Sequence, residues 1–201
     1  MFDESIRPIK DRVLIPISQL LGRKLSPNFI TFISFLFGII SFVFIINDWV
    51  GYGLIFWIIN RFTDGLDGTV ARVTNRQSDF GGYIDIMADF VIYSIIPIGF
   101  VLHNGSAQKE LLVLAIMLAI FYINGASWMY LSSILEKNGQ GDKTLVTSVT
   151  MPKGLIEGFE TVITYTLFYI FPDKIIYLFI ALGIFTIIGA GQRVLWAYRK
   201  L

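Results

Sequence analysis

The sequence predicts an all-α integral membrane protein, in which six transmembrane helices follow an amphipathic helix. Of its 201 residues, 55% are hydrophobic and 15% are charged, whereas about 25% of the residues of a soluble domain are charged. The chain also contains several apolar segments of about 20 residues, the length that an α-helix needs to cross a bilayer. We therefore expect two parts: residues 1–22 as a helix beside the membrane, and residues 23–201 as a six-helix transmembrane domain.

The N-terminal segment, residues 4–21, has an amphipathic pattern. Its apolar residues recur at helical spacing and charged residues fall between them: Ile6, Ile9, Val13, Leu14, Ile17 and Leu20 alternate with Arg7, Lys10, Asp11 and Arg12. This pattern predicts a helix that lies in the plane of the membrane interface. The alternative, a seventh helix buried in the bundle, is disfavoured by the density of charge.

Six predicted spans follow this segment and set the orientation of the chain. They cover residues 27–47, 51–73, 79–102, 110–135, 153–171 and 174–198. Lysine and arginine gather on the side that holds both termini and the connections after the second and fourth spans, while the other side has only Lys109 and Lys174. Because cytoplasmic loops are enriched in basic residues, we expect both termini to be cytosolic and the protein to lie in the cytoplasmic (inner) membrane.

Four aspartates stand where a membrane helix should tolerate none: Asp64, Asp67, Asp85 and Asp89. A carboxylate at the centre of a membrane helix costs about 2.5–3.5 kcal/mol, so these four need a function. Residues three or four apart share a helix face, and the short connection 73–78 makes the two helices antiparallel neighbours. The carboxylates can then face one another around divalent cations, and an all-oxygen ligand set favours Mg²⁺, Mn²⁺ or Ca²⁺ over zinc.

Small residues accompany these acids. Gly68, Ala71 and Gly81 remove side-chain bulk, so that a phosphate or a planar group can approach the helix backbone. Close packing of helices is the alternative explanation, because small residues mediate helix contacts in membranes. The four neighbouring acids favour the pocket.

The spacing Asp-x2-Asp-Gly-x2-Ala-Arg-x8-Gly-x3-Asp-x3-Asp resembles the signature of the CDP-alcohol phosphotransferase (CDP-alcohol phosphatidyltransferase) family. All eight positions match, from Asp64 to Asp89. The segment Ser26-Pro27-Asn28-Phe29-Ile30-Thr31 is similar to the Pro-Asn-x2-Thr start of that family's first span. The resemblance covers the first half of the chain, and the second half matches only in its number of helices.

The resemblance implies that a substituted phosphate passes from a CDP-linked donor to an alcohol, with release of CMP. Two Mg²⁺ (or Mn²⁺) ions would be held by the four aspartates, and Asp89 would be the general base. The nucleotide would contact Asn28, Thr31, Asp67, Gly68, Ala71, Arg72 and Gly81. The active site would be cytosolic, and the resemblance also suggests a homodimer.

The acceptor is less well defined by the sequence. Arg76, Lys153 and Arg193 could bind the phosphate of a phosphorylated acceptor, although cytoplasmic positive charge explains them equally. Glu157 and Glu160 could instead attract a cationic alcohol, pair with a basic side chain, or interact with the positive helix N-terminus. The two glutamates argue against a phosphorylated acceptor, and serine, choline, inositol phosphate and glycerol phosphate all stay open.

We therefore expect a phospholipid-synthesis enzyme that uses CDP-diacylglycerol or a CDP-dialkyl lipid as donor and a small alcohol as acceptor. The same motif also serves the opposite polarity, in which a CDP-choline-type donor reacts with a lipid alcohol. A membrane prenyltransferase is disfavoured because the acidic motifs of that enzyme class lie far apart in sequence, whereas here they lie within one hairpin. A cation transporter is disfavoured because no internal repeat is visible. The formal net charge of +1 indicates no nucleic-acid partner, and the absence of cysteine excludes thiolate metal sites.

Overall fold

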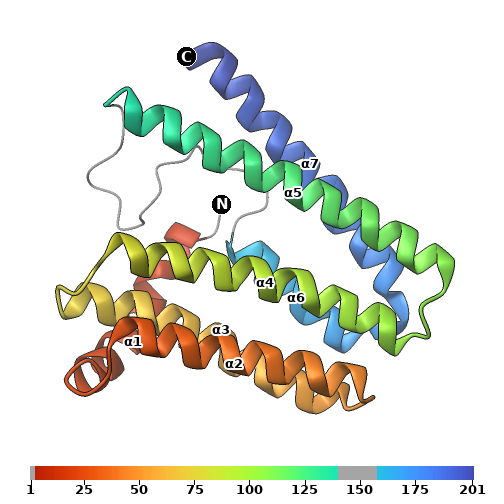
Figure 1. Cartoon of the computed structure of the whole chain (residues 1–201), viewed down its shortest axis with the longest axis horizontal. Coiled ribbons are helices and arrows are strands. Elements are labelled where there is room, and N and C mark those ends of the chain that lie inside the picture. The colour runs from red at the N-terminus through yellow and green to blue at the C-terminus, as the bar shows by residue number, and fades with distance from the viewer. Residues whose placement is uncertain (1–2, 140–157) are drawn as a thin grey trace.

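The computed structural model of the chain describes residues 3–139 and 158–201, and these are helical with short connections (Figure 1). The helices are α1 (Asp3–Leu21), α2 (Pro27–Ile46), α3 (Val50–Val73), α4 (Asp79–His103), α5 (Gln108–Lys137), α6 (Gly158–Ile170), the 3₁₀ turn η1 (Pro172–Lys174) and α7 (Ile175–Lys200). No strand occurs in the described ranges. The all-α prediction is confirmed, and each predicted segment coincides with a helix; residues 153–157 of the fifth predicted span lie outside the described residues.

Four helical segments are long and apolar enough to cross a membrane: α2, α4, α5 and the segment Pro172–Lys200. By length and composition these make the chain an integral membrane protein. Helix α3 is long enough, with 24 residues, but its second half carries Arg61, Asp64, Asp67 and Arg72. The described part of α6 has 13 residues, fewer than a span requires.

Two serine caps begin the helices that meet at the end of α3. The Oγ atom of Ser26 accepts a hydrogen bond from the Phe29 N–H at 3.3 Å, with Pro27 at the first helical position. The Oγ atom of Ser78 likewise accepts one from the Gly81 N–H at 3.0 Å. Such caps satisfy amide groups that the first turn leaves unpaired, so they fix where α2 and α4 begin.

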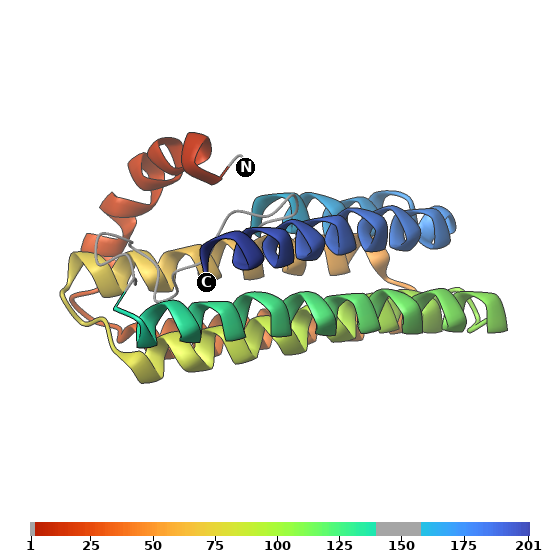
Figure 2. The ribbon, with the colours of Figure 1, turned by 90° about the horizontal axis from the view of Figure 1, so that it is seen from above.

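The α-helices that follow α1 form two layers, which Figure 2 shows from above: α2, α4 and α5 in one layer, and α3, α6 and α7 in the other. Across the layers α2 packs on α3 and α5 packs on α7. Because successive helices alternate in direction, the end of α3, the start of α4 and the end of α7 lie on the same side of the bundle (Figure 1).

An aromatic core fills the half of the bundle away from that side. Trp57, Phe100, Tyr165, Phe168 and Phe179 are fully buried. The Phe168 ring lies 4.8 Å from that of Tyr165 and 5.2 Å from that of Phe179. Such tilted and edge-to-face contacts stabilise aromatic cores, and here they join α3, α4, α6 and α7 into one support.

Helix α1 packs against α3 at the other end of the bundle. Leu14 of α1 is buried with Ile30 of α2 and with Leu66 and Val70 of α3, whereas Val13 and Leu20 are exposed. The predicted N-terminal helix is therefore present and has one buried face. That face covers the side of α3 next to Asp67.

Close packing of α2 on α4 depends on Gly38, and it yields a stability prediction. A Cβ atom at this position would collide with Cδ1 of Ile92 and lie 2.8 Å from its Cγ1. We expect Gly38→Ala to destabilise the protein by about 1–3 kcal/mol, although alanine is the better helix former. Thermal unfolding in detergent measures the effect, and Gly51→Ala is the control because nothing lies near a Cβ there. The additional change Ile92→Ala should reduce the penalty; an unfolding temperature of Gly38→Ala equal to that of the control would contradict the packing argument.

Candidate active site

A cavity of about 440 Å³ lies where the start of α2, the end of α3 and the start of α4 meet. Its wall includes ten of the residues singled out in the sequence: Asn28, Thr31, Asp67, Gly68, Ala71, Arg72, Arg76, Gly81, Asp85 and Asp89. The seven residues that the family resemblance assigns to the nucleotide are all among them. We call this space the motif cavity.

Asp67 is the most firmly held acid of the motif cavity. The Thr31 hydroxyl donates a hydrogen bond to Asp67 Oδ2 at 2.6 Å, and the Gly68 N–H donates one to Oδ1 at 2.5 Å. The Asp67 residue is only 4% exposed. A buried carboxylate without such partners would be strongly unfavourable, so Thr31 on α2 and the α3 backbone together determine the direction of this side chain.

The glycines of the motif have polar atoms close beside them. A Cβ atom on Gly68 would meet only Nη1 of Arg72, at 3.3 Å, and one on Gly81 would meet only Asn28 Oδ1 and Ser78 Oγ, each at 3.0 Å. These three neighbours are polar, and all of them line the same cavity. Gly38 differs, because an added Cβ would strike an apolar side chain of another helix. The polar surroundings of Gly68 and Gly81 favour the pocket interpretation, and Asn28 of α2 also brings a second helix close to Gly81.

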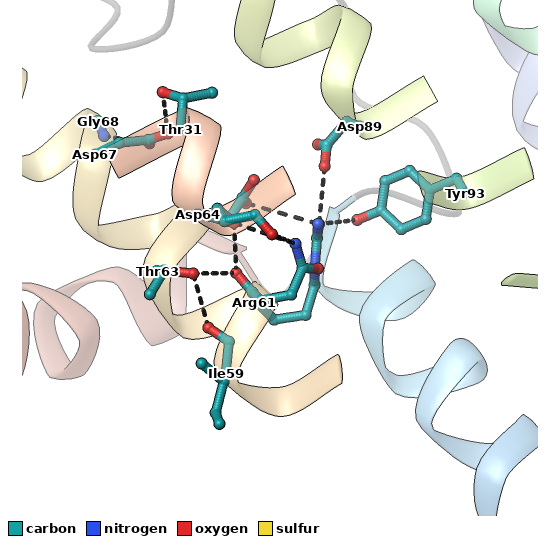
Figure 3. A network of polar contacts seen from close by, with 11 residues as sticks. Thr31, Ile59, Arg61, Thr63, Asp64, Asp67, Gly68, Asp89 and Tyr93 are labelled. Atoms are coloured by element: carbon teal, nitrogen blue, oxygen red, sulfur yellow. Dashed lines mark hydrogen bonds and ion pairs between the residues drawn. The ribbon is translucent and has the colours of Figure 1, made fainter. Parts of the chain in front are cut away.

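Arg61 of α3 joins two of the motif acids, Asp64 and Asp89 (Figure 3). Its Nη1 atom lies 2.9 Å from Asp89 Oδ1, 2.9 Å from the Tyr93 hydroxyl and 3.6 Å from Asp64 Oδ2. Its side chain is 9% exposed. Sequence reasoning missed Arg61 and Tyr93. The signal was available, since an arginine within a membrane helix, three residues before an aspartate, requires a partner.

The four aspartates gather at one end of the α3–α4 hairpin in two different settings. Asp67, Asp85 and Asp89 line the motif cavity, whereas Asp64 is not among its lining residues and lies near Arg61. Among the described residues, no three of His, Cys, Asp and Glu are grouped closely enough to hold a metal ion. The oxygen-only donors along one cavity wall nevertheless suit Mg²⁺ or Mn²⁺ in kind.

A second cavity, of about 450 Å³, adjoins the first and is lined by residues of α4, α5, α6 and α7. We call it the bundle cavity. It shares Ile86, Asp89 and Trp128 with the motif cavity, so Asp89 stands at the boundary of the two. Much of its wall is apolar, and its polar lining includes Arg193, whose Nη1 donates a hydrogen bond to Asn124 Oδ1 at 2.5 Å.

The residues proposed for the acceptor are dispersed. Arg76 lines the motif cavity and Arg193, which is 3% exposed, lines the bundle cavity. Glu160 lies in the first turn of α6 and lines neither. Lys153 and Glu157 fall outside the described residues. Asp89 lines both cavities, and each cavity also includes one of these basic residues in its wall.

Comparisons with known proteins agree with this geometry. Residues 24–196 match the family model described as CDP-alcohol phosphatidyltransferase. The chain is 29% identical over 178 residues to "Inner membrane protein YnjF" of Escherichia coli, covering 86% of this chain and 83% of that protein. It is 27% identical over 177 residues to "CDP-diacylglycerol--inositol 3-phosphatidyltransferase" of Candida albicans, covering 87% and 75%.

A solved structure shares the fold. The crystal structure of Mycobacterium tuberculosis phosphatidylinositol phosphate synthase (PgsA1) with CDP-DAG bound superposes with a TM-score of 0.69, covering 91% of this chain and 92% of that one, at 18% sequence identity. The family match extends over most of the chain, far beyond the first half that carries the motif. The chain therefore belongs to the CDP-alcohol phosphatidyltransferase family and is a membrane-embedded transferase of phospholipid biosynthesis.

Proposed function

We propose that this enzyme transfers the phosphatidyl group, or its dialkyl equivalent, from a CDP-linked lipid to a small alcohol and releases CMP. The observation that carries the proposal is the single cavity whose wall includes all the motif positions but Asp64, and which meets a second cavity at Asp89. Relatives support the lipid donor: the PgsA1 structure contains CDP-DAG, and the Candida relative is named for CDP-diacylglycerol and inositol. Family membership argues against the prenyltransferase and the transporter.

The donor's nucleotide would occupy the motif cavity. Its volume of about 440 Å³ lies within the range of ligand pockets, about 300–1,000 Å³. The low bulk of Gly68, Ala71 and Gly81 would admit the nucleotide close to the helix backbones. Asn28 and Thr31 would contact it from α2, and Arg72 supplies positive charge beside the diphosphate.

The acids of the hairpin would hold two Mg²⁺ (or Mn²⁺) ions: Asp64, Asp67, Asp85 and Asp89. Bound divalent ions neutralise the charge that develops on a diphosphate as its P–O bond breaks. The contribution of the chain itself is to orient ligands, as Thr31 does for Asp67 through the 2.6 Å hydrogen bond. Hydrogen-bond partners of this kind are as much a part of a metal site as the ligands themselves.

Asp89 would act as the general base. From its position between the cavities it would accept the proton of the acceptor hydroxyl, whose oxygen then attacks the lipid-bearing phosphorus while the bond to CMP breaks. The acceptor would approach through the bundle cavity, where Arg193 and Asn124 are polar groups on a largely apolar wall. Arg76, Lys153, Glu157 and Glu160 are the other residues that we propose for acceptor selection.

The proposed topology has six spans, with α3 and α6 completing the set, and the amphipathic residues 1–22 preceding the catalytic domain of residues 23–201. The charges of α3 support this arrangement, because the buried Arg61 and Asp67 side chains are paired inside the protein, as charges in membrane helices generally are. Positive-inside placement would put both termini and the motif cavity on the cytosolic side of the cytoplasmic membrane. We further propose a homodimer.

Asp89→Asn tests the proposed base. We expect CMP release from CDP-diacylglycerol by the purified protein, with Mg²⁺ and a panel of alcohols, to fall by about 10²–10⁴-fold. Asp79→Asn is the matched control, because Asp79 is an exposed aspartate in the first turn of the same helix and lines neither cavity. Wild-type turnover by Asp89→Asn would refute the assignment, and the alcohol that supports turnover identifies the acceptor.

Thr31→Val tests the support of Asp67. The change keeps the side-chain shape but removes the donor, so we expect the affinity for Mn²⁺ to weaken by about 10–100-fold. Mn²⁺ titration followed by electron paramagnetic resonance measures it. The control is Thr63→Val, because within residues 3–139 and 158–201 the Thr63 hydroxyl bonds only to backbone carbonyls of its own helix. Equal Mn²⁺ affinity in the two variants would contradict the proposed role of Thr31.

A further inference from the structure

We infer that Arg61 is a positioning residue for the transfer, which holds Asp89 in its working orientation; this inference rests on the proposed role of Asp89 as the base. Arg61 lies on α3 and Asp89 on α4. Their ion pair, Nη1 to Oδ1 at 2.9 Å, therefore bridges the two helices of the motif hairpin (Figure 3).

Arg61 would act through Asp89 rather than on the substrate. Its side chain lines neither the motif cavity nor the bundle cavity, whereas Asp89 lines both and Tyr93 lines the second. The guanidinium group thus contacts two residues that line the cavities but is not among the lining residues itself. That placement is typical of the group that orients a catalytic side chain.

The guanidinium group is itself held on several sides. Its Nε donates to Asn60 Oδ1 at 2.7 Å, and its central carbon lies 4.9 Å from the Trp57 ring centre and 5.0 Å from the Tyr93 ring centre. Cation–π contacts of this length are attractive. The position of Arg61 is therefore set by contacts with its own helix, α3, and with α4. Lysine cannot replace the guanidinium group, which is planar and donates several hydrogen bonds.

The support extends into the aromatic core. The Trp57 Nε1–H donates to Thr166 Oγ1 at 3.0 Å, and the Tyr165 hydroxyl donates to the Tyr93 carbonyl oxygen at 2.6 Å. Trp57 and Tyr165 are completely buried. Hydrogen bonds to α6 thus hold the Trp57 ring and the backbone of Tyr93 beside Arg61, and a well-packed region determines where Asp89 Oδ1 lies.

This arrangement leaves a distinct role for each oxygen of Asp89. Within the described residues, the hydrogen bonds to Asp89 use Oδ1, so the proposed contacts of Asp89 with a metal ion and with the acceptor proton fall to Oδ2 while Oδ1 is held. A misplacement of a catalytic group by about 1 Å can cost about 100-fold in rate. Loss of Arg61 should therefore lower kcat while leaving binding of the donor and acceptor largely intact.

A purely structural ion pair would behave differently. If Arg61 only neutralised Asp64 and Asp89, its removal would destabilise the fold, and each remaining folded molecule would turn over normally. Kinetic constants normalised to folded protein separate the two roles, and a double-mutant cycle with Asp89 separates them again.

The experiment compares the purified wild type with four variants: Arg61→Gln, Arg61→Lys, Asp89→Asn and Arg61→Gln/Asp89→Asn. The control is Arg199→Gln, because Arg199 is an exposed arginine at the end of α7. CMP release from CDP-diacylglycerol gives kcat and KM, and detergent-phase unfolding gives the folded fraction. We expect Arg61→Gln to lose about 100-fold in kcat at nearly unchanged KM, and the double variant to be no slower than Asp89→Asn alone. Arg61→Lys, which keeps the charge but not the planar fork, should also have reduced kcat.

The inference is overturned if Arg61→Gln has the wild-type kcat per folded molecule. It is also overturned if the double variant is slower than Asp89→Asn by the same factor that separates Arg61→Gln from the wild type. If Arg61→Gln does not fold, Arg61→Lys decides: reduced kcat at unchanged KM supports positioning, and full kcat refutes it. The proposed function fails separately, through an active Asp89→Asn. If Asp89→Asn is inactive and Arg61→Gln is fully active, the proposed function is retained and only the positioning role of Arg61 is refuted.

Discussion

The placement of charge inside an apolar bundle constrains the rest of this structure. Four carboxylates and an arginine in the α3–α4 hairpin would each be costly in a membrane on its own, so each must be paired or put to use. Asp67 is held by Thr31 and the Gly68 amide, and Asp89 is held by Arg61. These pairings bring α2, α3 and α4 together around the motif cavity, and they explain why the polar residues of α3 face inward.

The two ends of the bundle have complementary tasks. The aromatic core at one end is closely packed and joins four helices through contacts such as Phe168 with Phe179, whereas the other end encloses two cavities that meet at Asp89. Serine caps at Ser26 and Ser78 determine where α2 and α4 begin. Rigid packing and fixed helix starts are what allow side chains from separate helices to keep a common geometry, as pre-organised sites require.

Much of this could be predicted from the sequence, for physical reasons. Apolar length specifies membrane helices, and helical spacing predicted that acids and small residues of the two neighbouring helices gather, as Asp67, Gly68 and Gly81 do in the wall of one cavity. The bundle cavity could not be predicted, because it depends on how α5 and α7 pack on each other far from the motif. Arg61 was overlooked although its spacing to Asp64 is a local signal, and its two closest partners, Asp89 and Tyr93, lie 28 and 32 positions away, where no local pattern points to them. The sequence also predicted that all four acids surround the metal ions. In the described residues the acids are less closely grouped than this, because Asp64 lies near Arg61.

The most direct measurement is pulsed electron paramagnetic resonance of Mn²⁺ bound to the purified protein in the presence of CDP. If the hairpin carboxylates hold divalent ions against a nucleotide diphosphate, the Mn²⁺ spectrum should show hyperfine coupling to ³¹P in the wild type. The coupling should disappear when Asp67 and Asp85 are both replaced by asparagine. Mn²⁺ that binds without phosphorus coupling, or coupling that persists without these two acids, would place the chemistry elsewhere and contradict the assignment of this cavity.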